Sequence, residues 1–444
     1  MSETKKKSFM EKFEEVCEKT LLPVGTKIAS QRHLASIRDG MAILIPVTIT
    51  GGLAILLAQP PIPSTVTEPS NILYAFLLAW KSFADAYSGI LFIPYYLSIG
   101  IISLYVVVGI SYRLSEKYGL DKLTSVIGSL FVFLSVSDAM DISTGSINTG
   151  MLGAGYMFGA IIIAILTVEI TNFFVKRNIT IKLPDSVPPN VGNSFISLIP
   201  TMFNIVLFTL LNILCTKVTG AGITSLIFTI FQPIMSATGS LPSLLLLSTI
   251  QTLFWFFGIH GDNMVSPVVT PITTAGLAAN MEAYAAGVAP NALPYIFAGY
   301  MMAIFSGWII AHARMICMNF FCKSEQLRAI PKVAIIPSLF NINEPSVFGV
   351  PTVLNVYLLL PDMLCNVVGI SLYYFLAKAG IVGRFFVSVP WTTPVYLQAF
   401  LGTMDWKNLV LSFALLAIFT CIQLPFVKIY DKTLCEQEAA NKAE

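Results

Sequence analysis

The chain has few charged side chains for its length. Asp, Glu, Lys and Arg make up 11% of its 444 residues, whereas a soluble globular protein carries about 25%. Three stretches have no charged residue: Gly40–Thr67, Ala86–Tyr112 and Ile142–Val168. Each is longer than the roughly 20 residues that cross a bilayer as a helix. The composition therefore excludes a soluble enzyme with an ordinary core and predicts an all-α polytopic membrane protein.

Paired cysteines and enzyme motifs are also missing. The seven cysteines are dispersed, with no CxxC pair, so we expect packing residues in a reducing compartment and no metal site. The sequence contains no P-loop, HExxH or GxSxG motif, and we expect no cofactor. Its net charge of +2 and its short basic clusters give no nucleic-acid signature. No apolar region directly follows Lys5–Lys7, so we expect no cleavable signal peptide.

The polar segments between the apolar runs predict the order of the membrane spans. Residues 1–35 are rich in Lys and Glu and are expected to form a cytoplasmic tail, because basic residues collect on the cytoplasmic side. Arg113–Lys122 is expected to be a charged loop. Residues 71–112 have room for two spans, or for one span and a short interfacial helix. We expect about ten spans of roughly 20 residues each, including Ile37 to Gln59–Pro63, Leu123–Ser137, 150–175, Asp362–Ala377, Phe385–Leu401 and Leu409–Val427.

A domain boundary is expected at about residues 176–193, where PDSVPPNVGN disfavours helix. This divides the chain into residues 36–183, residues 184–430 and a cytoplasmic tail, 431–444. Val218–Ala313 contains no Lys or Arg, so its turns are either external or belong to re-entrant hairpins. Broken segments are favoured by six prolines: Pro233, Pro242, Pro267, Pro271, Pro290 and Pro294.

A carboxylate lies within the proline-punctuated apolar stretch Ile336–Pro351, which reads IPSLFNINEPSVFGVP. An ionisable side chain at membrane depth is costly and marks a functional site. Pro345 directly follows Glu344 and disfavours helix there, so we expect a broken or re-entrant helix that lines a cavity. Glu344 either binds substrate hydroxyls or caps the helix that begins at Pro345, where the helix dipole stabilises negative charge. The two roles are compatible.

A second polar cluster, WFFGIHGDN, covers Trp255–Asn263. Gly258 and Gly261 flank His260 and let the backbone approach a ligand closely. His260 therefore either binds the substrate or is satisfied by a backbone carbonyl inside the helical bundle. In both cases we expect His260 to lie within the helices formed by the second half of the chain.

Two tryptophans complete a set of side chains that suits a sugar. Trp255 and Trp391 offer flat apolar faces, and a sugar ring has one apolar face of C–H groups and a rim of hydroxyls. The carboxylate, amide and imidazole groups supply hydrogen bonds to that rim. Each tryptophan could instead belong to an interfacial belt. Asn148 is a further candidate for lining the cavity.

The remaining tryptophans, and His312, are not expected to bind substrate. Trp80, Trp308 and Trp406 are expected in the belt or in packing. His312 lies close to Arg314, and the two are expected at the edge of the membrane, where Arg314 would open a cytoplasmic loop.

The segments FGIHGDN (257–263) and FNINEPSVFGVPTVLN (340–355) resemble enzyme IIC, the membrane subunit of the bacterial sugar phosphotransferase system. The lactose, cellobiose and diacetylchitobiose branch is the most similar. HLASIRDGMAILIPVTITGG (33–52) and IKLPDSVPPNVGNSF (181–195) extend the resemblance over essentially the whole chain. Asp262 and Asn263 bear on substrate choice in this comparison.

The resemblance implies a homodimer in the bacterial plasma membrane, with both termini cytoplasmic and two re-entrant hairpins. The first half would form the dimer scaffold, and the second half would carry the sugar across the membrane in an elevator-type movement. Matched residue by residue, His260 and Glu344 would bind near the reactive hydroxyl of the sugar, with Gly261 beside them. Asn343 would bind neighbouring hydroxyls, and the two tryptophans would contact the rings.

The resemblance also implies that the phosphoryl group comes from a phosphocysteine on a separate enzyme IIB, which enzyme IIA supplies. Since no cysteine here lies in a phosphate-cradling loop, the chain carries no phosphoryl group itself. Glu344 would act as general base toward the sugar 6-hydroxyl, with His260 orienting that hydroxyl. The substrate would be a β-linked disaccharide of the cellobiose or diacetylchitobiose type. Two alternatives are a proton- or sodium-coupled secondary sugar carrier and a membrane sensor without transport.

Overall fold

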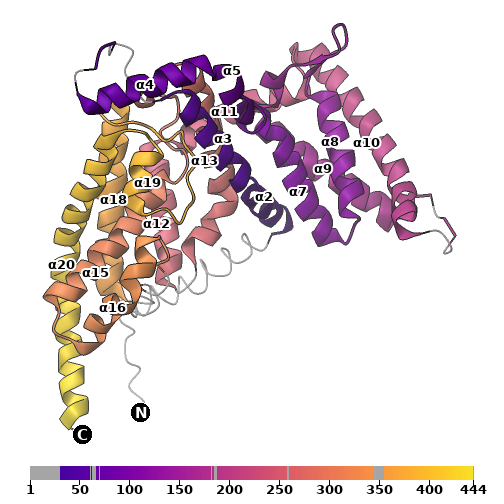
Figure 1. Ribbon diagram of the computed structural model, residues 1–444. Coiled ribbons are helices and arrows are strands. Elements are labelled where there is room, and N and C mark those ends of the chain that lie inside the picture. Colours follow the sequence, from indigo (N-terminus) through magenta and orange to yellow (C-terminus); the bar gives the residue numbers. More distant parts are fainter. Residues whose placement is uncertain are drawn as a thin grey trace, which may run out of the picture.

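The computed structural model describes residues 31–60, 62, 67–69, 71–181, 183–184, 188–257, 260–343, 346 and 355–443. Within these ranges the chain is almost entirely helical, and Figure 1 shows two groups of helices side by side. The expected all-α class is therefore confirmed for the described residues.

The first part of the chain folds into long helices and short helical turns. A two-stranded antiparallel hairpin follows α8, with Met140 paired to Ile147. The elements are α2 Arg32–Ala42, α3 Ile45–Ala58, α4 Ile72–Ala86, α5 Ser88–Leu91, α6 Ile93–Tyr96, η1 Ile99–Ile101, α7 Ile102–Tyr118, α8 Lys122–Val136, β1 Met140–Asp141, β2 Ser146–Ile147, η2 Thr149–Leu152, η3 Ala154–Tyr156 and α9 Met157–Lys176.

The second part contains the longest helices and two non-helical segments. Helices α10 and α11 pack against α8 and α9, whereas α12 packs on α18, and α15 and α18 pack on α20. The elements are α10 Pro189–Thr219, α11 Ile223–Thr238, α12 Leu241–Phe256, α13 Gly261–Ala285, η4 Pro290–Ala292, α14 Met301–Ala303, η5 Ile304–Trp308, α15 Ile309–Phe321, α16 Glu325–Leu339, α18 Val356–Lys378, α19 Val395–Leu401 and α20 Trp406–Ala443.

Six of the described helices are long and apolar enough to cross a membrane. Two further pairs pass the same test together but are bent, α2 with α3 by 41° and the α4 region with the α5–α6 region by 80°. Length and composition therefore support six spans, or eight if each bent pair crosses once. The protein is thus a multi-pass membrane protein, and the number ten stays a prediction.

In the first group of helices, which includes α2, α7, α8 and α9, glycine allows close packing. Hydroxyl groups such as that of Ser111 donate to carbonyl oxygens of their own helix. A Cβ added to Gly109 of α7 would lie 2.5 Å from the carbonyl oxygen of Gly40 in α2, so only glycine permits this approach. Ser111 Oγ donates to Val107 O at 2.6 Å within the same helix. In lipid such internal hydrogen bonds remove the cost of an unpaired polar group.

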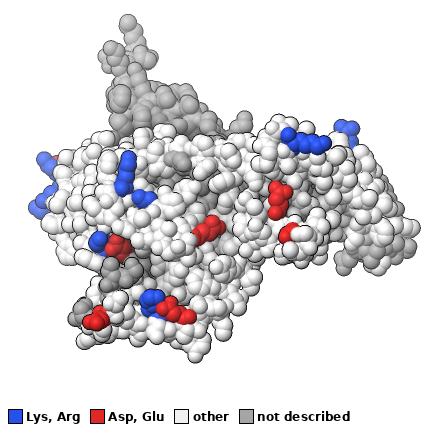
Figure 2. Space-filling model, turned by 90° about the horizontal axis from the view of Figure 1, so that it is seen from above, with Lys and Arg blue, Asp and Glu red and all other residues white. Residues whose placement is uncertain are grey.

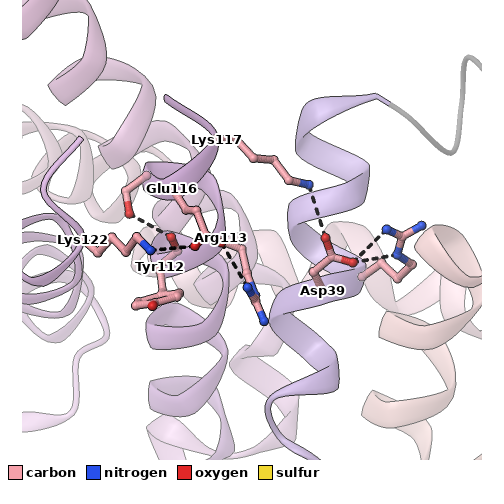
Figure 3. A network of polar contacts seen from close by, with 8 residues as sticks. Asp39, Tyr112, Arg113, Glu116, Lys117 and Lys122 are labelled. Atoms are coloured by element: carbon pink, nitrogen blue, oxygen red, sulfur yellow. Dashed lines mark hydrogen bonds and ion pairs between the residues drawn. The ribbon is translucent and has the colours of Figure 1, made fainter. Parts of the chain in front are cut away.

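Charged side chains mark one edge of this group, where α7 ends and α8 begins (Figure 3). Lys117 of α7 lies 3.4 Å from Asp39 of α2. Glu116 pairs with Arg113 at 3.0 Å and with Lys122 at 2.6 Å. Exposed ion pairs of this kind contribute little to stability, because water and salt screen them. Their main value is that they locate the edge at which the helices leave the membrane.

The face seen from above carries scattered charged groups separated by wide uncharged surface (Figure 2). Among the described residues, the exposed large side chains include Phe76, Phe83 and Ile90 from α4 and α5. Exposed apolar surface of this extent suits lipid or a partner rather than water.

The non-helical segments of the second part are held by buried amides. Asn280 of α13 donates to Tyr295 O at 2.8 Å and to Phe385 O at 2.7 Å. Asn408 of α20 donates to Gly383 O at 2.9 Å. Irregular backbone at membrane depth needs such partners, because no water is present to satisfy it. These two side chains therefore fix the segments between α13 and α14 and between α18 and α19.

The end of α20 caps the start of α16. Asp431 accepts hydrogen bonds from the backbone N–H groups of Lys323 and Ser324 at 3.0 and 2.8 Å. Glu438 accepts from Ser324 Oγ at 2.7 Å and from the next two backbone N–H groups at 3.2 Å each. Two carboxylates thus satisfy the N–H groups that every helix start leaves unpaired.

Two expectations about helix ends are wrong, and the end of the chain is helical. Helix α7 runs on to Tyr118 instead of ending before a loop at Arg113–Lys122, and it stops at Gly119, whose φ of 68° ends a helix readily. Helix α10 begins at Pro189, inside the connector expected to be non-helical. Proline is well suited to the first turn because its missing N–H is not needed there. The tail expected after residue 430 is the last part of α20.

Two further expectations need correction, one about a membrane span and one about prolines. Phe385–Leu401 is not a span, since residues 385–394 are not helical and α19 covers only Val395–Leu401. Conversely, Pro267 and Pro271 do not break α13. Proline 267 leaves the carbonyl of Asn263 without its helical donor, and Ser266 Oγ donates to that carbonyl at 3.2 Å.

Candidate functional site

A cavity of about 520 Å³ lies in the second part of the chain, between α12, the start of α13, η5, α15 and α18. Small-molecule sites commonly measure roughly 300–1,000 Å³. Its wall includes one face of α12, since Ser248, Gln251, Thr252 and Trp255 recur at helical spacing. Segments far apart in the sequence therefore meet around one space.

Asp262 joins three polar side chains at one end of this cavity. Its Oδ1 accepts a hydrogen bond from Gln251 Nε2 at 2.8 Å, and its Oδ2 accepts one from the Trp255 indole Nε1 at 3.0 Å. His260 Nδ1 lies 3.9 Å from the same Oδ2. The Trp255 and His260 rings lie 4.3 Å apart between centroids. The indole and the imidazole are thus arranged around one carboxylate.

Gly261 is required by packing between the two helices of this end. A Cβ at that position would lie 2.2 Å from Gln251 O and 2.6 Å from the Trp255 ring. Because main-chain and ring atoms cannot move aside easily, only glycine lets α13 start against α12 here. The expected role of Gly261 beside the sugar is thus accompanied by a structural one.

The segment after α16 brings two asparagines to the cavity. Asn341 has a left-handed φ of 65°, which asparagine tolerates better than most residues. Its Nδ2 donates to the carbonyl oxygens of Trp391 and Thr393 at 2.6 and 2.7 Å. Asn343 Oδ1 accepts from Ser338 Oγ. Asn341 thus fixes the backbone that carries Trp391, whose side chain is 43% exposed and lines the cavity.

A buried ion pair forms another part of the wall. Arg314 of α15 donates to the carboxylate of Asp362 in α18, which also accepts from Gln423 Nε2 of α20 at 2.7 Å. Arg314 is only 5% exposed. Among the described residues, neither Arg314 Nε nor Asn366 Oδ1 has a hydrogen-bond partner, although both atoms are buried.

His312 and Arg314, which the sequence led us to expect at the membrane edge, are both buried between helices. His312 is 6% exposed, and its Nε2 donates to Ser338 O at 2.8 Å while Nδ1 lies 3.0 Å from the Tyr396 hydroxyl. Arg314 lies inside α15 and does not open a loop. Each side chain is buried because its partner sits on a neighbouring helix, which the sequence alone does not reveal.

The structure brings together four of the predicted site residues. Trp255, His260, Asn343 and Trp391 all line the one cavity. Glu344 lies outside the described residues. Asn148 does not line this cavity, and its Oδ1 instead accepts from Gly150 N at 3.0 Å at the start of η2.

Sequence reasoning did not assign several residues of the cavity wall. These include Trp308, expected only in the belt or in packing, and the ion pair of Arg314 with Asp362. Opposite charges within two helix-length apolar runs were the available signal, because unpaired charges are rare at membrane depth. Among the described residues no cluster of His, Cys, Asp or Glu could hold a metal ion.

The fold and this cavity define a multi-pass membrane protein with a cavity among its helices that is lined by both apolar and polar side chains. The family model for "Phosphotransferase system, EIIC" matches residues 38–365. The chain belongs to this family, whose members work with EIIB and EIIA and bind a sugar.

Three known proteins show how far the similarity extends. The lichenan permease IIC component of Bacillus subtilis (strain 168) is 31% identical over 97% of this chain and 96% of its own length. The lactose-specific EIICB component of Staphylococcus epidermidis is 30% identical over 95% of this chain and 71% of its own length. The crystal structure of ChbC, the IIC component from an N,N'-diacetylchitobiose-specific phosphotransferase system, gives a TM-score of 0.85 at 31% identity. That similarity covers 95% of this chain and 99% of ChbC. Family membership does not favour the secondary-carrier alternative.

Proposed function

We propose that this permease component binds a β-linked disaccharide of the cellobiose or diacetylchitobiose type. It moves the sugar across the membrane and presents the sugar 6-hydroxyl to phosphorylated enzyme IIB. The observation that carries the proposal is the cavity in which Trp255, His260, Asn343 and Trp391 meet. Aromatic faces can stack on sugar rings, and the imidazole and amide groups can bind hydroxyls.

The names of similar proteins support the choice of sugar. Lichenan, lactose and N,N'-diacetylchitobiose appear in them, and all three contain β-linked sugars. Two tryptophans in one cavity suit a substrate with two rings, since each ring offers one apolar face.

The proposed chemistry follows from the reacting groups. The sugar 6-hydroxyl attacks phosphorus, the new P–O bond forms, and the bond from phosphorus to the enzyme IIB cysteine sulfur breaks, which releases a thiolate. The proton of the hydroxyl passes to Glu344 as general base, and His260 orients the hydroxyl. The protein chain itself carries no phosphoryl group in this scheme.

The proposed orientation places the charged edge of Figure 3 in the cytoplasm. Lys117 and Lys122 lie at that edge with Arg113, and basic residues collect on the cytoplasmic side. The start of α2 and the end of α20 point toward the same side of the molecule (Figure 1). This arrangement supports cytoplasmic termini.

We extend the proposal to the assembly. Residues 36–183 form the scaffold of a homodimer, with α10 and α11 packed against it. Residues 184–430 include the cavity helices that move in an elevator-type transport step, with ten spans and two re-entrant hairpins. The glycine-mediated packing of α2 on α7 supports a rigid scaffold.

A sugar-binding panel on purified protein tests the substrate, with cellobiose, diacetylchitobiose, lactose, maltose and sucrose as ligands. We expect binding of one or more β-linked sugars and none of maltose or sucrose. The sugar that binds is then offered to vesicles that contain the protein, with and without phosphorylated enzyme IIB inside. Phosphorylated sugar should accumulate only with enzyme IIB. Accumulation of unmodified sugar that collapses with an ionophore would contradict the proposal.

Glu344→Gln tests the general base, and Trp406→Phe on the exposed start of α20 is the matched control. We expect the Glu344→Gln variant to lose at least about tenfold in phosphorylation rate, since general bases contribute roughly 10²–10⁴-fold. Full phosphorylation by this variant with unchanged sugar affinity would show that Glu344 takes no proton.

A further inference from the structure

Asp262 is a polar residue of the cavity on which an amide and an indole N–H converge. One oxygen accepts from Gln251 at 2.8 Å and the other from the Trp255 indole at 3.0 Å. Its side chain is 45% exposed, so the carboxylate is placed at the cavity surface rather than in the core. The residue begins α13 directly after Gly261, the glycine that brings α12 and α13 together.

We propose that Asp262 is a positioning residue that fixes the Trp255 ring as a stacking platform for the sugar and thereby sets affinity and choice of sugar. This inference rests on the proposed function, because it assigns a role within the same sugar site. A tryptophan side chain has two rotatable bonds, and stacking on a sugar needs one orientation of the ring. The hydrogen bond from Nε1 to a carboxylate selects that orientation, since charge-assisted hydrogen bonds are stronger and more directional than neutral ones.

The same carboxylate also organises the neighbours of the ring. His260 Nδ1 lies 3.9 Å from the oxygen that holds the indole, and its ring lies 4.3 Å from Trp255 between centroids. Displacing the indole would therefore disturb the imidazole as well. Gln251, which is 8% exposed, anchors the other carboxylate oxygen from α12. Gln251 thus fixes one oxygen of Asp262, and the other oxygen fixes the indole ring of Trp255.

A double-mutant cycle separates positioning from direct contact with the sugar. Asp262→Ala, Trp255→Phe and the double variant are compared with the unmodified protein for binding of the sugar identified by the panel. Phenylalanine keeps an aromatic face but has no N–H for Asp262. We expect Asp262→Ala to weaken binding about tenfold in the unmodified background and less than about threefold in the Trp255→Phe background. Equal losses in both backgrounds would overturn the inference.

Asp262→Asn keeps the shape and one acceptor oxygen, so it is the conservative rescue variant. We expect it to restore affinity to within about threefold and to restore the near-ultraviolet circular dichroism that Asp262→Ala loses from an immobilised indole. Asp85→Asn is the control, because that carboxylate pairs with Lys81 on the surface. An Asp262→Ala spectrum identical to that of the unmodified protein would also overturn the inference.

The panel distinguishes failure of this inference from failure of the proposed function. If the unmodified protein binds no β-linked sugar, the proposed function is wrong and the inference falls with it. If it binds such a sugar and the two substitutions act additively, only the positioning role is wrong.

Discussion

The two helix groups satisfy their polar groups in different ways. In α7 and α9 several buried hydroxyls donate to carbonyls of their own helix, as Ser111 does to Val107 O and Thr167 to Ile163 O, each at 2.6 Å. Around the cavity, carboxylate and amide side chains instead bond across helices, as Gln251 does to Asp262 and Gln423 does to Asp362. Self-contained helices can pack as rigid units, whereas cross-helix networks can present polar atoms to a ligand. This difference supports the proposal that one group of helices is the scaffold and the other binds the sugar.

The largest expected effect comes from breaking the buried ion pair on the cavity side. Arg314→Gln leaves the Asp362 carboxylate without its charge partner. Removing one partner of a buried pair costs about 3–5 kcal/mol. We expect a large fall in the thermal unfolding midpoint of the protein in detergent.

Two variants check this prediction against its alternatives. The double replacement Arg314→Met with Asp362→Leu should regain most of the stability, because apolar isosteres often replace such pairs without loss. Lys81→Gln, which affects a pair with side chains 48% and 64% exposed, should cost less than about 1 kcal/mol. A larger loss from Lys81→Gln than from Arg314→Gln would contradict the comparison.

The next effect concerns packing on the scaffold side. Gly109→Leu would force α2 and α7 apart, since even a Cβ would lie 2.5 Å from Gly40 O. Overpacking of this kind costs about 1–3 kcal/mol. We expect a lower unfolding midpoint but unchanged sugar affinity in the folded fraction. Gly89→Leu, where a Cβ meets no atom within 4 Å, is the control, and an equal loss there would argue against close packing as the cause.

The next smaller effect concerns sugar affinity, which a side chain at the cavity surface should change more than it changes stability. Trp391→Ala removes a partly exposed ring, so stability should change little. Sugar affinity should fall by a factor that corresponds to about 0.5–1.5 kcal/mol for aromatic contact beyond burial, measured by titration calorimetry. Trp406→Ala, with 64% of the side chain exposed and no place in the cavity, should leave affinity unchanged. A loss of stability without a loss of sugar affinity would show that Trp391 has a structural role and does not bind the sugar.

The smallest effect is expected in the hairpin after α8. Ser143 and Thr144 donate to Asp141, and these hydrogen bonds lower the pKa of its carboxyl to about 2. A depressed pKa stabilises the folded state above the unfolded pKa of about 3.9, and this contribution is lost as pH falls toward 2. The free energy of unfolding should therefore differ slightly less between pH 6 and pH 3 in the Asp141→Asn variant than in the unmodified protein. An unchanged pH dependence would show that the hairpin contributes nothing to global unfolding.

The sequence predicted the fold wherever composition decides the outcome. Long apolar runs predicted membrane spans, and α9 and α18 lie close to the expected segments 150–175 and Asp362–Ala377. It misjudged Pro267, because the rescue by Ser266 Oγ depends on a side-chain hydrogen bond that no composition rule reports. It also misjudged Phe385–Leu401, whose apolar residues are buried although the backbone is not helical.

The site was predictable only in part, because its partners are distant in the chain. The polar and aromatic pattern indicated Trp255, His260 and Trp391 as candidates, the family resemblance gave them roles toward a sugar, and all three line the cavity. Arg314 and Asp362 are 48 positions apart, and nothing local to either shows that the other lies beside it. The role of Glu344 stays a prediction.

The carboxylates of α20 at the start of α16 have a practical consequence. Helix α16 runs from this capped end to Leu339, and Asn341 and Asn343 follow within a few residues. A truncation that removes residues 431–443 would remove the Glu438 acceptor of the first two backbone N–H groups of α16 and would loosen the helix that ends at the cavity. Expression tags and fusion partners are therefore better joined beyond Ala443 than substituted for the end of the helix.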